Sequence, residues 1–512
     1  MSRKRALMWI GVFSIMISIY GCASQDDSEN ENKQPTVSPV TMDNTAKSQN
    51  DAGEVALDFN NKDYIEVTET VTTSEGDVNV TYHLYHDICY VSNPVDPIYQ
   101  CMDIKVPIKI DEVDVDAEDA PIVFVNSVSD YMSATVSDDA QVTNHSTSKE
   151  LTINNQLALV AGYVVVEAGC RGRDNKTEDG LYYGKAPATI VDLKAAVRYL
   201  KYNDSVMAGN ANWIVSTGTG AGGAMSALLG ASGNDELYDS YLSHVGAAEG
   251  DDQIFAAACY YPITDLEHAD MAYEWMFGGI ELEDKVVDQH ISKQYQEAFV
   301  LYQESLNYTG LNQFGSLTAM NYEEYLMNQY LIPSAIEYIS QLSEDERQEY
   351  LDENEWIRWN NKKAKFTFDE YVQHIGRSRS LPAFDAFDLS TAENRLFGTA
   401  NINARHFTTL GIEFSSISSN HEMDGSLQEI IHMMNPMYFI HNNHPGCTDH
   451  WWIRHGTSDT NTALPVVINL ATGLENYNKD VNTKLYWDAG HGDNEDAEQF
   501  IQWIADITGY KS

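Results

Sequence analysis

Two side chains near the C-terminus have the types and the spacing of a proton relay. Asp459 follows the apolar segment HWWIRHG and precedes a predicted helix, and His491, flanked by glycines in AGHGD, lies 32 residues further on. One helix and one strand fit between them, so both would stand at the same edge of a parallel sheet. Such an aspartate holds the imidazole tautomer while the histidine takes a proton from a hydroxyl. Taken singly, the aspartate would cap a helix and the histidine would be an ordinary loop residue, but their order favours acyl-transfer chemistry.

The hydroxyl on which such a relay acts is missing from its expected position. The stretch STGTGAGGAMSALLG, residues 216–230, reads as a strand end, a tight glycine turn and a helix of small residues. That is the layout of the G-x-S-x-G nucleophile elbow. Gly218 and Gly222 match its flanking glycines, but Gly220 stands at the centre. Since the elbow backbone is strained, glycine suits it, and we predict a preserved turn with a vacated nucleophile position.

Other hydroxyl groups near the turn are poor replacements. Thr217 and Thr219 flank the turn and are expected to point away from the site, and Ser226 lies in the helix that follows. A water molecule activated by His491, with Asp459 behind it, is a further route to slow hydrolysis. Loss of the nucleophile lowers turnover in a serine hydrolase by roughly 10⁶-fold. We therefore expect impaired catalysis.

Donors for a developing negative charge are predicted beside the turn. The backbone N–H of Ala221, next to the elbow centre, is the first, and the loop VNSVSDYM after the predicted strand APIVFVN supplies the second at Ser129. Asp130 follows in the same loop. Its carboxylate would oppose an oxyanion if it pointed inward, whereas an outward, solvated carboxylate would be harmless; the sequence leaves both open.

The segments around these residues alternate between strand-like and helix-like patterns. APIVFVNSV and LALVAGYVVVEAGCRG are continuous apolar runs, typical of strands buried on both faces of a parallel sheet. The amphipathic segment APATIVDLKAAVRYLKYND precedes the strand and glycine turn of the elbow. This order predicts an α/β fold with a doubly wound, mostly parallel sheet. Residues 64–90 and the segment CMDIKVPIKI instead have the pattern of antiparallel strands.

The order of the patterns also predicts how the chain is divided. Residues 263–432 are rich in Tyr, Gln and Glu, with helical stretches such as SAIEYISQLSEDERQEYLDENEWIRW, and are typical of a lid or substrate insertion. The predicted segments are a signal peptide (1–21), a flexible tether (22–55), the first part of the core (56–262), the helical insertion (263–432) and the second part of the core (433–512).

The first residues have the character of a targeting segment. Basic residues at 3–5 precede an apolar run over 6–20, which is shorter than the roughly 20 residues of a membrane span. The run ends in ISIYGC, which resembles a bacterial lipobox with Cys22 as the lipidated first mature residue. The resemblance implies an exported cell-envelope lipoprotein, anchored through Cys22 at the outer membrane or cell surface. A plain signal peptide or a short anchor is the alternative.

The charge and the cysteine content of the chain exclude some classes of binding partner. The 512-residue chain has 31 Lys+Arg against 77 Asp+Glu, a formal net charge of −46. Such a surface repels phosphate backbones, so nucleic acid is not expected as a partner. Export would permit disulfides, and Cys89 and Cys101 flank a loop that one could close. The cysteine and histidine spacings do not match a metal site, and no metal or cofactor is predicted.

Several of these stretches together resemble bacterial tannases, the serine esterases that cleave galloyl esters. They are GTGAGGAMSALLGASGN, GYVVVEAGCRGRDN, YYGKAPATIVDLKAAVRYL, RHGTSDTNTAL and GHGD, and the similarity extends from about residue 60 to the end. The resemblance implies an α/β-hydrolase fold. The family's elbow reads GTSAGG, which puts Gly220 where the family has its serine and implies that Asp459 and His491 are the acid and the base.

The resemblance also implies a subsite for a phenolic ring. The galloyl-contacting Lys, Glu and Asp of the family fall on Arg379, Glu393 and Asn461. The glutamate is kept, the arginine keeps the charge but not the shape, and the asparagine has lost the carboxylate. A small aromatic ester or phenolic ligand is the expected partner. Three functions stay open: an impaired esterase, a surface-tethered binding protein for aromatic esters or phenolic glycoconjugates, and a slow esterase that uses water activated by His491.

Overall fold

The computed structural model describes residues 55–136, 149–417, 423 and 425–511, which all belong to one unit of the chain, Ala46–Ser512. The predicted signal peptide, the lipidation site Cys22 and the predicted tether up to residue 54 lie outside the described residues. Val55, the last residue of that tether, donates its N–H to Ser92 O at 3.0 Å. Within the described ranges, the helices are too short or too polar to cross a membrane.

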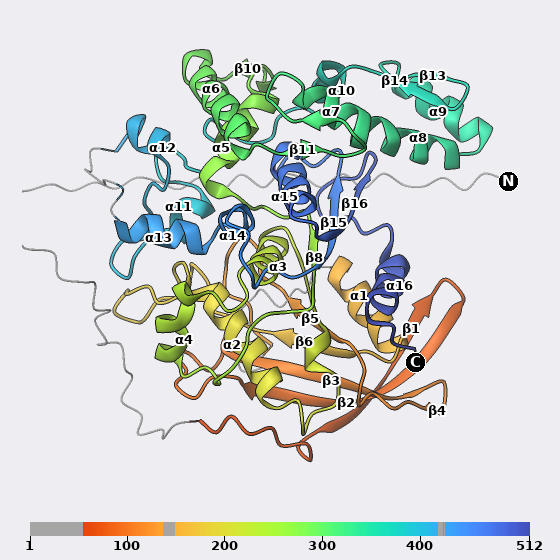
Figure 1. Cartoon of the computed structure of the whole chain (residues 1–512), viewed down its shortest axis with the longest axis vertical. Coiled ribbons are helices and arrows are strands. Elements are labelled where there is room, and N and C mark those ends of the chain that lie inside the picture. The colour runs from red at the N-terminus through yellow and green to blue at the C-terminus, as the bar shows by residue number, and fades with distance from the viewer. Residues whose placement is uncertain (1–54, 137–148, 418–422, 424, 512) are drawn as a thin grey trace, which may run out of the picture. The chain divides into compact units, whose positions relative to one another are not determined.

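A ten-stranded sheet runs through the described residues (Figure 1). Its order is β1-β2-β3-β6-β5-β7-β8-β15-β16, with β4 paired to β3. The strands from β6 to β16 pair in parallel, and β1, β2, β3 and β6 pair antiparallel. The predicted α/β fold with a mostly parallel sheet is therefore confirmed. The strands are β1 Ile65–Thr73, β2 Gly76–Cys89, β3 Cys101–Ile110, β4 Val113–Asp114, β5 Ile122–Asn126, β6 Val164–Ala168, β7 Ile214–Thr219, β8 Ala256–Tyr260, β15 His450–Gly456 and β16 Asp480–Tyr486.

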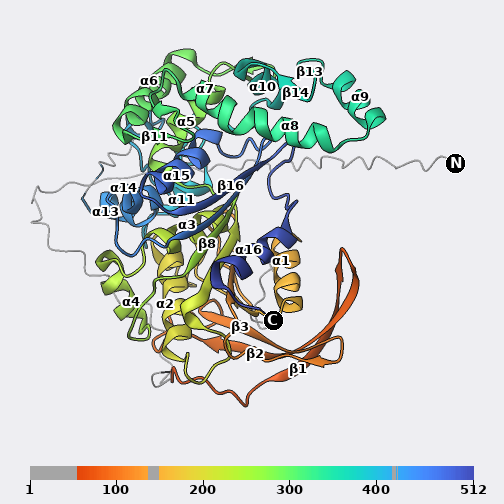
Figure 2. The ribbon, with the colours of Figure 1, turned by 45° about the vertical axis from the view of Figure 1, so that its right-hand side comes forward.

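Helices cover both faces of the sheet because its central strands are apolar on both sides. On one face of strand β5, Ile122 and Phe124 pack in a core with α2, α3 and α15. On the other face, Val123 and Val125 pack in a second core with α1 and α16. Figure 2 shows α1 and α16 on one side of the sheet and α2 and α3 on the other. The helices are α1 Lys149–Val160, α2 Ala188–Tyr202, α3 Ala221–Ala231, α4 Asp239–Val245, α15 Leu464–Asn476 and α16 Ala497–Thr508.

Between β8 and β15 the chain leaves the sheet and builds a helical region with three short hairpins. Figure 1 shows α5 to α10 in green to cyan at the top and α11 to α13 on the left. The elements are α5 Leu266–Phe277, β9 Glu281–Leu282, β10 Lys285–Val286, α6 Gln289–Leu306, β11 Thr309–Gly310, β12 Gly315–Ser316, α7 Tyr322–Leu326, a π-helical segment Met327–Leu331, α8 Ile332–Gln341, α9 Glu344–Glu353, β13 Arg358–Asn360, β14 Lys363–Lys365, α10 Phe368–Ile375, α11 Ala392–Leu396, α12 Thr409–Glu413, α13 Gly425–Met433 and α14 Pro436–His441.

The predicted helical stretch over residues 334–359 differs from the structure in two places. Helix α8 ends at Gln341, and α9 begins after Ser343. The Ser343 hydroxyl accepts the Glu346 N–H, and the Glu346 carboxylate accepts the Ser343 N–H. Such a capping box starts a new helix. The last residues of the stretch pair in the hairpin of β13 and β14.

The disulfide that the sequence left open between Cys89 and Cys101 is absent, and both are free thiols. The two residues lie opposite each other at the paired ends of β2 and β3. Each thiol donates instead to a backbone carbonyl, Cys89 to Val91 O and Cys101 to Ile98 O, both at 3.3 Å.

Candidate active site

Gly220 forms the turn between β7 and α3 and has a backbone conformation that side chains rarely adopt. Its φ is 61° and its ψ is −118°. The turn is held in place because the Gly220 N–H donates to Tyr260 O on the neighbouring strand at 2.9 Å. A Cβ built on Gly220 would lie 3.0 Å from His491 Nε2. The elbow geometry that the glycine-rich motif predicts is therefore present, and an imidazole faces its centre.

The neighbouring glycines of the turn let backbone segments approach closely. A Cβ on Gly218 would overlap the Gly222 carbonyl, and one on Gly223 would overlap Tyr260 O. A Cβ on Gly222 would lie 2.8 Å from Asn126 Oδ1. The Asn126 amide also donates to the carbonyls of Thr217 and Gly222, each at 3.2 Å. Strand β5 thus clamps the elbow through one buried asparagine.

Asp459 and His491 are brought together as their spacing predicts. Asp459 follows β15 and His491 follows β16, two parallel neighbours in the sheet. The buried Asp459 Oδ2 lies 2.9 Å from His491 Nδ1, and its Oδ1 accepts the Asn461 N–H at 2.8 Å. Burial acts to raise the pKa of Asp459, but the hydrogen bond from His491 and the nearby charges outweigh it, so that the pKa lies below its ordinary value. The carboxylate is therefore ionised and fixes the imidazole.

The ring of His491 is positioned by Tyr261 as well as by Asp459. The two ring centroids of His491 and Tyr261 are 5.2 Å apart, and the buried Tyr261 hydroxyl donates to Asp493 O at 2.8 Å. The His491 side chain is 30% exposed. Within the described part of the chain, its Nε2 makes no hydrogen bond. This nitrogen is thus free to act on a group above Gly220.

A second histidine beside the relay was not predicted from the sequence. His455 lies in β15, fully buried, with Nδ1 3.6 Å from Asp459 Oδ2. Burial lowers the pKa of His455 to about 4 despite the neighbouring carboxylate. At neutral pH it is uncharged and packs against Asp459 without pairing with it as an ion. The only signal in the sequence is its position four residues before Asp459, and a lone histidine in an apolar strand usually indicates core packing.

Of the two predicted oxyanion donors, Ala221 lies at the elbow, and the loop that carries Ser129 contacts it. Ala221 is the first residue of α3, so its N–H has no partner within the helix. The loop after β5 contacts the turn, because a Cβ on Gly222 would lie 3.0 Å from Val128 O. Ser129 follows in that loop and is exposed. The role of Ser129 as a donor stays a prediction.

The structure decides between the two orientations that the sequence left open for the Asp130 side chain: it points outward. Its side chain is 58% exposed and pairs with Arg173 at 2.6 Å. Arg173 Nε also donates to Asp130 O at 2.7 Å. The carboxylate is therefore solvated and neutralised by a guanidinium, and the same arginine holds the loop.

The hydroxyl groups near the elbow do not engage His491. Ser226 Oγ lies 2.9 Å from Ser216 Oγ and accepts the Asn126 amide at 3.0 Å, on the buried side of α3. Thr217 and Thr219 carry buried hydroxyls that make no hydrogen bond within the described residues. A replacement nucleophile from these side chains is thus not in place.

Arg379 and Glu393, two of the residues predicted to bind a phenolic ring, contact each other. Arg379 lies 3.5 Å from the buried Glu393 carboxylate, and its guanidinium sits 4.4 Å above the Phe384 ring. Burial raises the pKa of Glu393, although the charge of Arg379 acts in the opposite direction. Arg379 Nε is buried and makes no hydrogen bond within the described residues. The pair offers a donor fork and a carboxylate side by side.

The third predicted residue, Asn461, lies on the loop that carries Asp459, and one tyrosine ties this loop to the insertion. The Tyr273 hydroxyl accepts the Arg379 N–H and donates to Thr460 O, both at 3.0 Å. The side chain of Ser378 also donates to Thr460 O, at 2.9 Å. The insertion and the loop that carries Asp459 and Asn461 therefore form one wall beside the site. Tyr273, which organises it, could not be distinguished in the sequence from the many tyrosines that pack in the core.

Solved structures with the same architecture identify the family. The chain has 32% identity and a TM-score of 0.77 to the tannin acyl hydrolase from Lactobacillus plantarum, covering 88% of this chain and 98% of that one. It has 34% identity and a TM-score of 0.76 to Fusobacterium nucleatum tannase, covering 89% of this chain and 100% of that one. The chain belongs to the tannase family. The predicted membership of a tannase-like α/β-hydrolase esterase family is thereby confirmed.

Shorter similarities place this tannase family member among esterases. The BD-FAE family model matches residues 138–309. A stretch of 95 residues is 34% identical to Esterase LipQ of Mycobacterium tuberculosis (strain ATCC 25618 / H37Rv), and covers 19% of this chain and 21% of that esterase. In the described parts of the tannase-like chain, no three His, Cys, Asp or Glu side chains are grouped to hold a metal ion.

Proposed function

We propose that this tannase family member has impaired ester hydrolysis because Gly220 occupies the position of the nucleophile, and that it retains the capacity to bind aromatic esters. The observation that carries the proposal is the distance of 3.0 Å between His491 Nε2 and the point where a Cβ on Gly220 would lie. A base at this distance, held by a buried carboxylate, is placed to take a proton from a side-chain hydroxyl. Gly220 offers only hydrogen there.

The remaining groups support slow chemistry at most. Serine hydrolases that lose a relay residue keep roughly 10³–10⁴-fold acceleration over water through binding and oxyanion stabilisation. His491 Nε2 can accept a proton from a water molecule, and Asp459 then stabilises the imidazolium. The N–H of Ala221 supports the oxyanion. In this route the water oxygen adds to the ester carbonyl carbon and the alkoxide leaves with the proton from His491.

The ligand follows from the wall formed by the insertion. Arg379, Glu393 and Asn461 offer a guanidinium, a carboxylate and an amide, groups that hydrogen-bond phenolic hydroxyls. Tannases cleave galloyl esters, and a small aromatic ester or phenolic conjugate fits this set. A protein that holds such a ligand without rapid turnover would act as a binding protein. Its acidic surface disfavours nucleic acid as a partner.

The N-terminal residues support a location for the protein at the cell envelope. The lipobox-like ISIYGC supports lipidation at Cys22, which would tether the domain to the cell envelope. Replacement of Cys22 by alanine should shift the protein from the membrane fraction to the soluble fraction. Unchanged fractionation of the Cys22→Ala variant would contradict lipid anchoring.

The test of the proposal is to restore the hydroxyl. The Gly220→Ser variant and the natural chain are assayed on methyl gallate and ethyl ferulate, and both are titrated with gallate. We expect the variant to hydrolyse at least 10³-fold faster, with His491→Ala abolishing the gain. Gly220→Ala is the matched control, because it adds the same Cβ without a hydroxyl and should remain inactive.

Two results would contradict the proposal. The first is a natural chain that turns over these esters as fast as the Gly220→Ser variant and that loses this activity on replacement of His491 by alanine. The second is a Gly220→Ser variant that folds and binds gallate but does not hydrolyse its ester, because the defect would then lie outside residue 220.

A further inference from the structure

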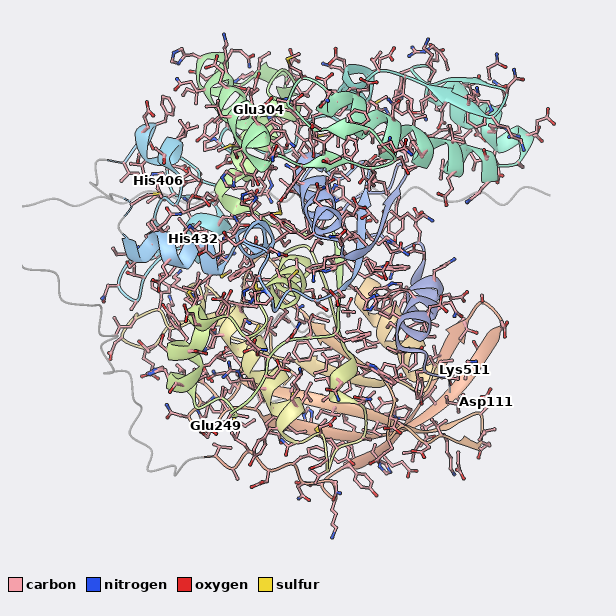
Figure 3. All side chains as sticks on the ribbon, in the orientation of Figure 1. Asp111, Glu249, Glu304, His406, His432 and Lys511 are labelled. Atoms are coloured by element: carbon pink, nitrogen blue, oxygen red, sulfur yellow. The ribbon has the colours of Figure 1, made fainter. Side chains whose placement is uncertain are left out.

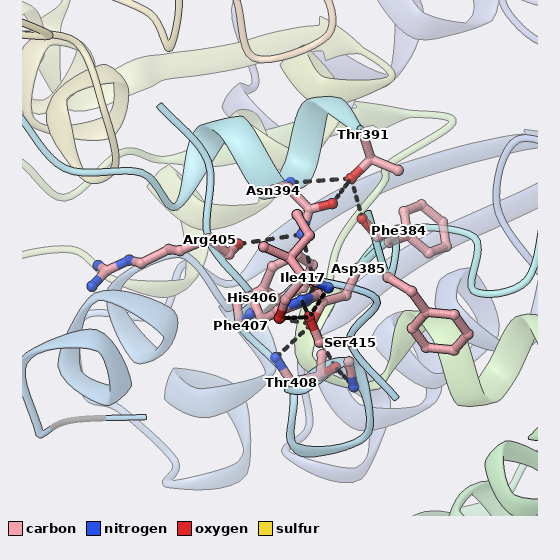
Figure 4. A network of polar contacts seen from close by, with 12 residues as sticks. Phe384, Asp385, Thr391, Asn394, Arg405, His406, Phe407, Thr408, Ser415 and Ile417 are labelled. Carbon is pink, nitrogen blue, oxygen red and sulfur yellow. Dashed lines mark hydrogen bonds and ion pairs between the residues drawn. The ribbon is translucent and has the colours of Figure 1, made fainter. Parts of the chain in front are cut away.

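A serine–histidine–aspartate arrangement lies in the helical insertion, formed by other residues than Asp459 and His491. Ser415 Oγ is 2.9 Å from His406 Nε2, and His406 Nδ1 is 2.7 Å from Asp385 Oδ1 (Figure 4). The three side chains occur in the chain order Asp, His, Ser. Such triads are recognised by geometry and roles, and they occur in several chain orders on unrelated folds.

Asp385 receives hydrogen-bond donors on both of its carboxyl oxygens. It is fully buried, and its Oδ1 accepts the Asn394 amide at 2.6 Å. Its Oδ2 accepts the N–H groups of Phe407 and Thr408 at 3.1 and 2.8 Å and the Thr408 hydroxyl at 2.7 Å. Because donors are directed at both oxygens, the carboxyl group acts as the acceptor toward His406, and we assign the proton of this contact to Nδ1 of the imidazole.

This proton assignment makes His406 a base toward Ser415. A neutral imidazole with its proton on Nδ1 has a lone pair on Nε2. The Ser415 hydroxyl can donate to that nitrogen at 2.9 Å or to Ile417 O at 3.3 Å, and the shorter contact is the one to His406. The Ser415 oxygen also accepts a hydrogen bond, from the Ile417 N–H at 3.2 Å.

Ser415 is partly exposed as a residue, while the two groups behind it are buried. His406 is 3% exposed and Asp385 is 0% exposed. In Figure 3, His406 lies on the left, in the part of the insertion where Figure 1 labels α11 to α13. Within the described residues no hydrogen bond joins this arrangement to Asp459 or His491, although Asp385 follows Phe384, and its partner Asn394 follows Glu393, in the wall formed by the insertion.

We propose that Ser415 is a nucleophile of this chain, with His406 as its base and Asp385 as the residue that positions the base. Its substrates are small carboxylic esters that approach from solvent. The Ser415 oxygen attacks the carbonyl carbon as its proton passes to His406 Nε2. The bond to the leaving oxygen then breaks, and that oxygen takes the proton from Nε2. Water repeats the sequence on the acyl-serine and releases the acid.

The test uses an alkyl fluorophosphonate, which reacts with activated serines in the same way. The serine oxygen displaces fluoride from phosphorus, and a stable phosphonyl-serine remains. The full chain is treated at pH 8, and the modified peptide is identified by mass spectrometry. We expect one adduct, on Ser415. The elbow cannot interfere, because Gly220 has no hydroxyl, whereas the Gly220→Ser variant should show a second adduct at residue 220.

Matched variants separate reactivity from exposure. Ser416 is an exposed neighbour whose hydroxyl donates to Phe387 O at 2.9 Å and does not contact His406. Ser415→Ala should abolish labelling, and Ser416→Ala should leave it unchanged. His406→Gln should slow labelling by about 10²-fold or more, as expected for loss of a general base.

A second measurement avoids any dependence on the folding of the His406 variant. Ser415→Cys and Ser416→Cys are compared for alkylation by iodoacetamide at pH 6, read at each peptide by mass spectrometry. A histidine base beside the thiol should make residue 415 react at least tenfold faster. An unlabelled Ser415, equal labelling of both serines, or equal alkylation of both cysteines would overturn the proposal and leave the cluster as a brace for α11.

Discussion

The imidazole of His491 hydrogen-bonds the buried carboxylate of Asp459 at 2.9 Å, so the ring is oriented from behind. Its other nitrogen faces a residue without a side chain. A carboxylate buried to this degree is costly unless it is paired, which means that the pair also stabilises the loops that carry it. The relay can therefore persist in the fold without a nucleophile in front of it.

We predict that Gly220→Ala and Gly220→Ser reduce stability. The φ of 61° disfavours any side chain, and the new Cβ would stand 3.0 Å from His491 Nε2, so that the imidazole must move by a few tenths of an ångström. Backbone strain of this kind costs about 1–3 kcal/mol. Guanidinium unfolding at pH 7 should show a lower free energy of unfolding for both variants. Gly279→Ala is the control, since its site is open and its φ is ordinary, and it should change stability little. If both Gly220 variants match the parent, the elbow is not strained.

We also predict a stability loss on acidification that arises from His455. Burial lowers its pKa to about 4 in the folded chain, against about 6.5 in an unfolded chain. Between these values the unfolded state binds a proton that the folded state does not, so stability falls as the pH falls from about 6.5 to about 4. The contribution is at most about 3 kcal/mol. His455→Gln should flatten this part of the curve of unfolding free energy against pH.

The control for this pH dependence is His290, which is exposed on α6. His290→Gln should retain the slope of the parent chain between pH 4 and 6.5. A His455→Gln variant with the same slope as the parent would show that other groups carry the acid sensitivity.

Short-range sequence patterns predict the central sheet of this molecule and the order of its elements. Apolar runs indicate the central strands because both of their faces are buried, and the interval between Asp459 and His491 indicates neighbouring parallel strands because one helix and one strand fill it. The contact between the two residues follows from that topology. Their catalytic roles, and that of Gly220, stay predictions.

Other features depend on contacts that local patterns do not contain. The orientation of Asp130 is decided by Arg173, 43 residues away in the chain. The triad of Asp385, His406 and Ser415 lies in an insertion whose loops have no strand periodicity to place them. His455 escapes notice because a histidine inside an apolar strand has the same local signal whether it packs in a core or abuts a relay.

Loss of Arg379 should weaken the binding of phenolic ligands. Its guanidinium lies between Glu393, at 3.5 Å, and the Phe384 ring, so that alanine would remove a donor fork and leave a buried carboxylate without its cation. Charge-assisted hydrogen bonds contribute roughly 1.5–3 kcal/mol, which corresponds to a tenfold to hundredfold weaker Kd for gallate. Calorimetric titration of Arg379→Ala measures this loss. Arg379→Lys keeps the charge and should retain most of the affinity, whereas Arg358→Ala, which removes an exposed arginine of β13, should retain all of it. Equal affinities across the three variants would place the ligand elsewhere than the wall formed by the insertion.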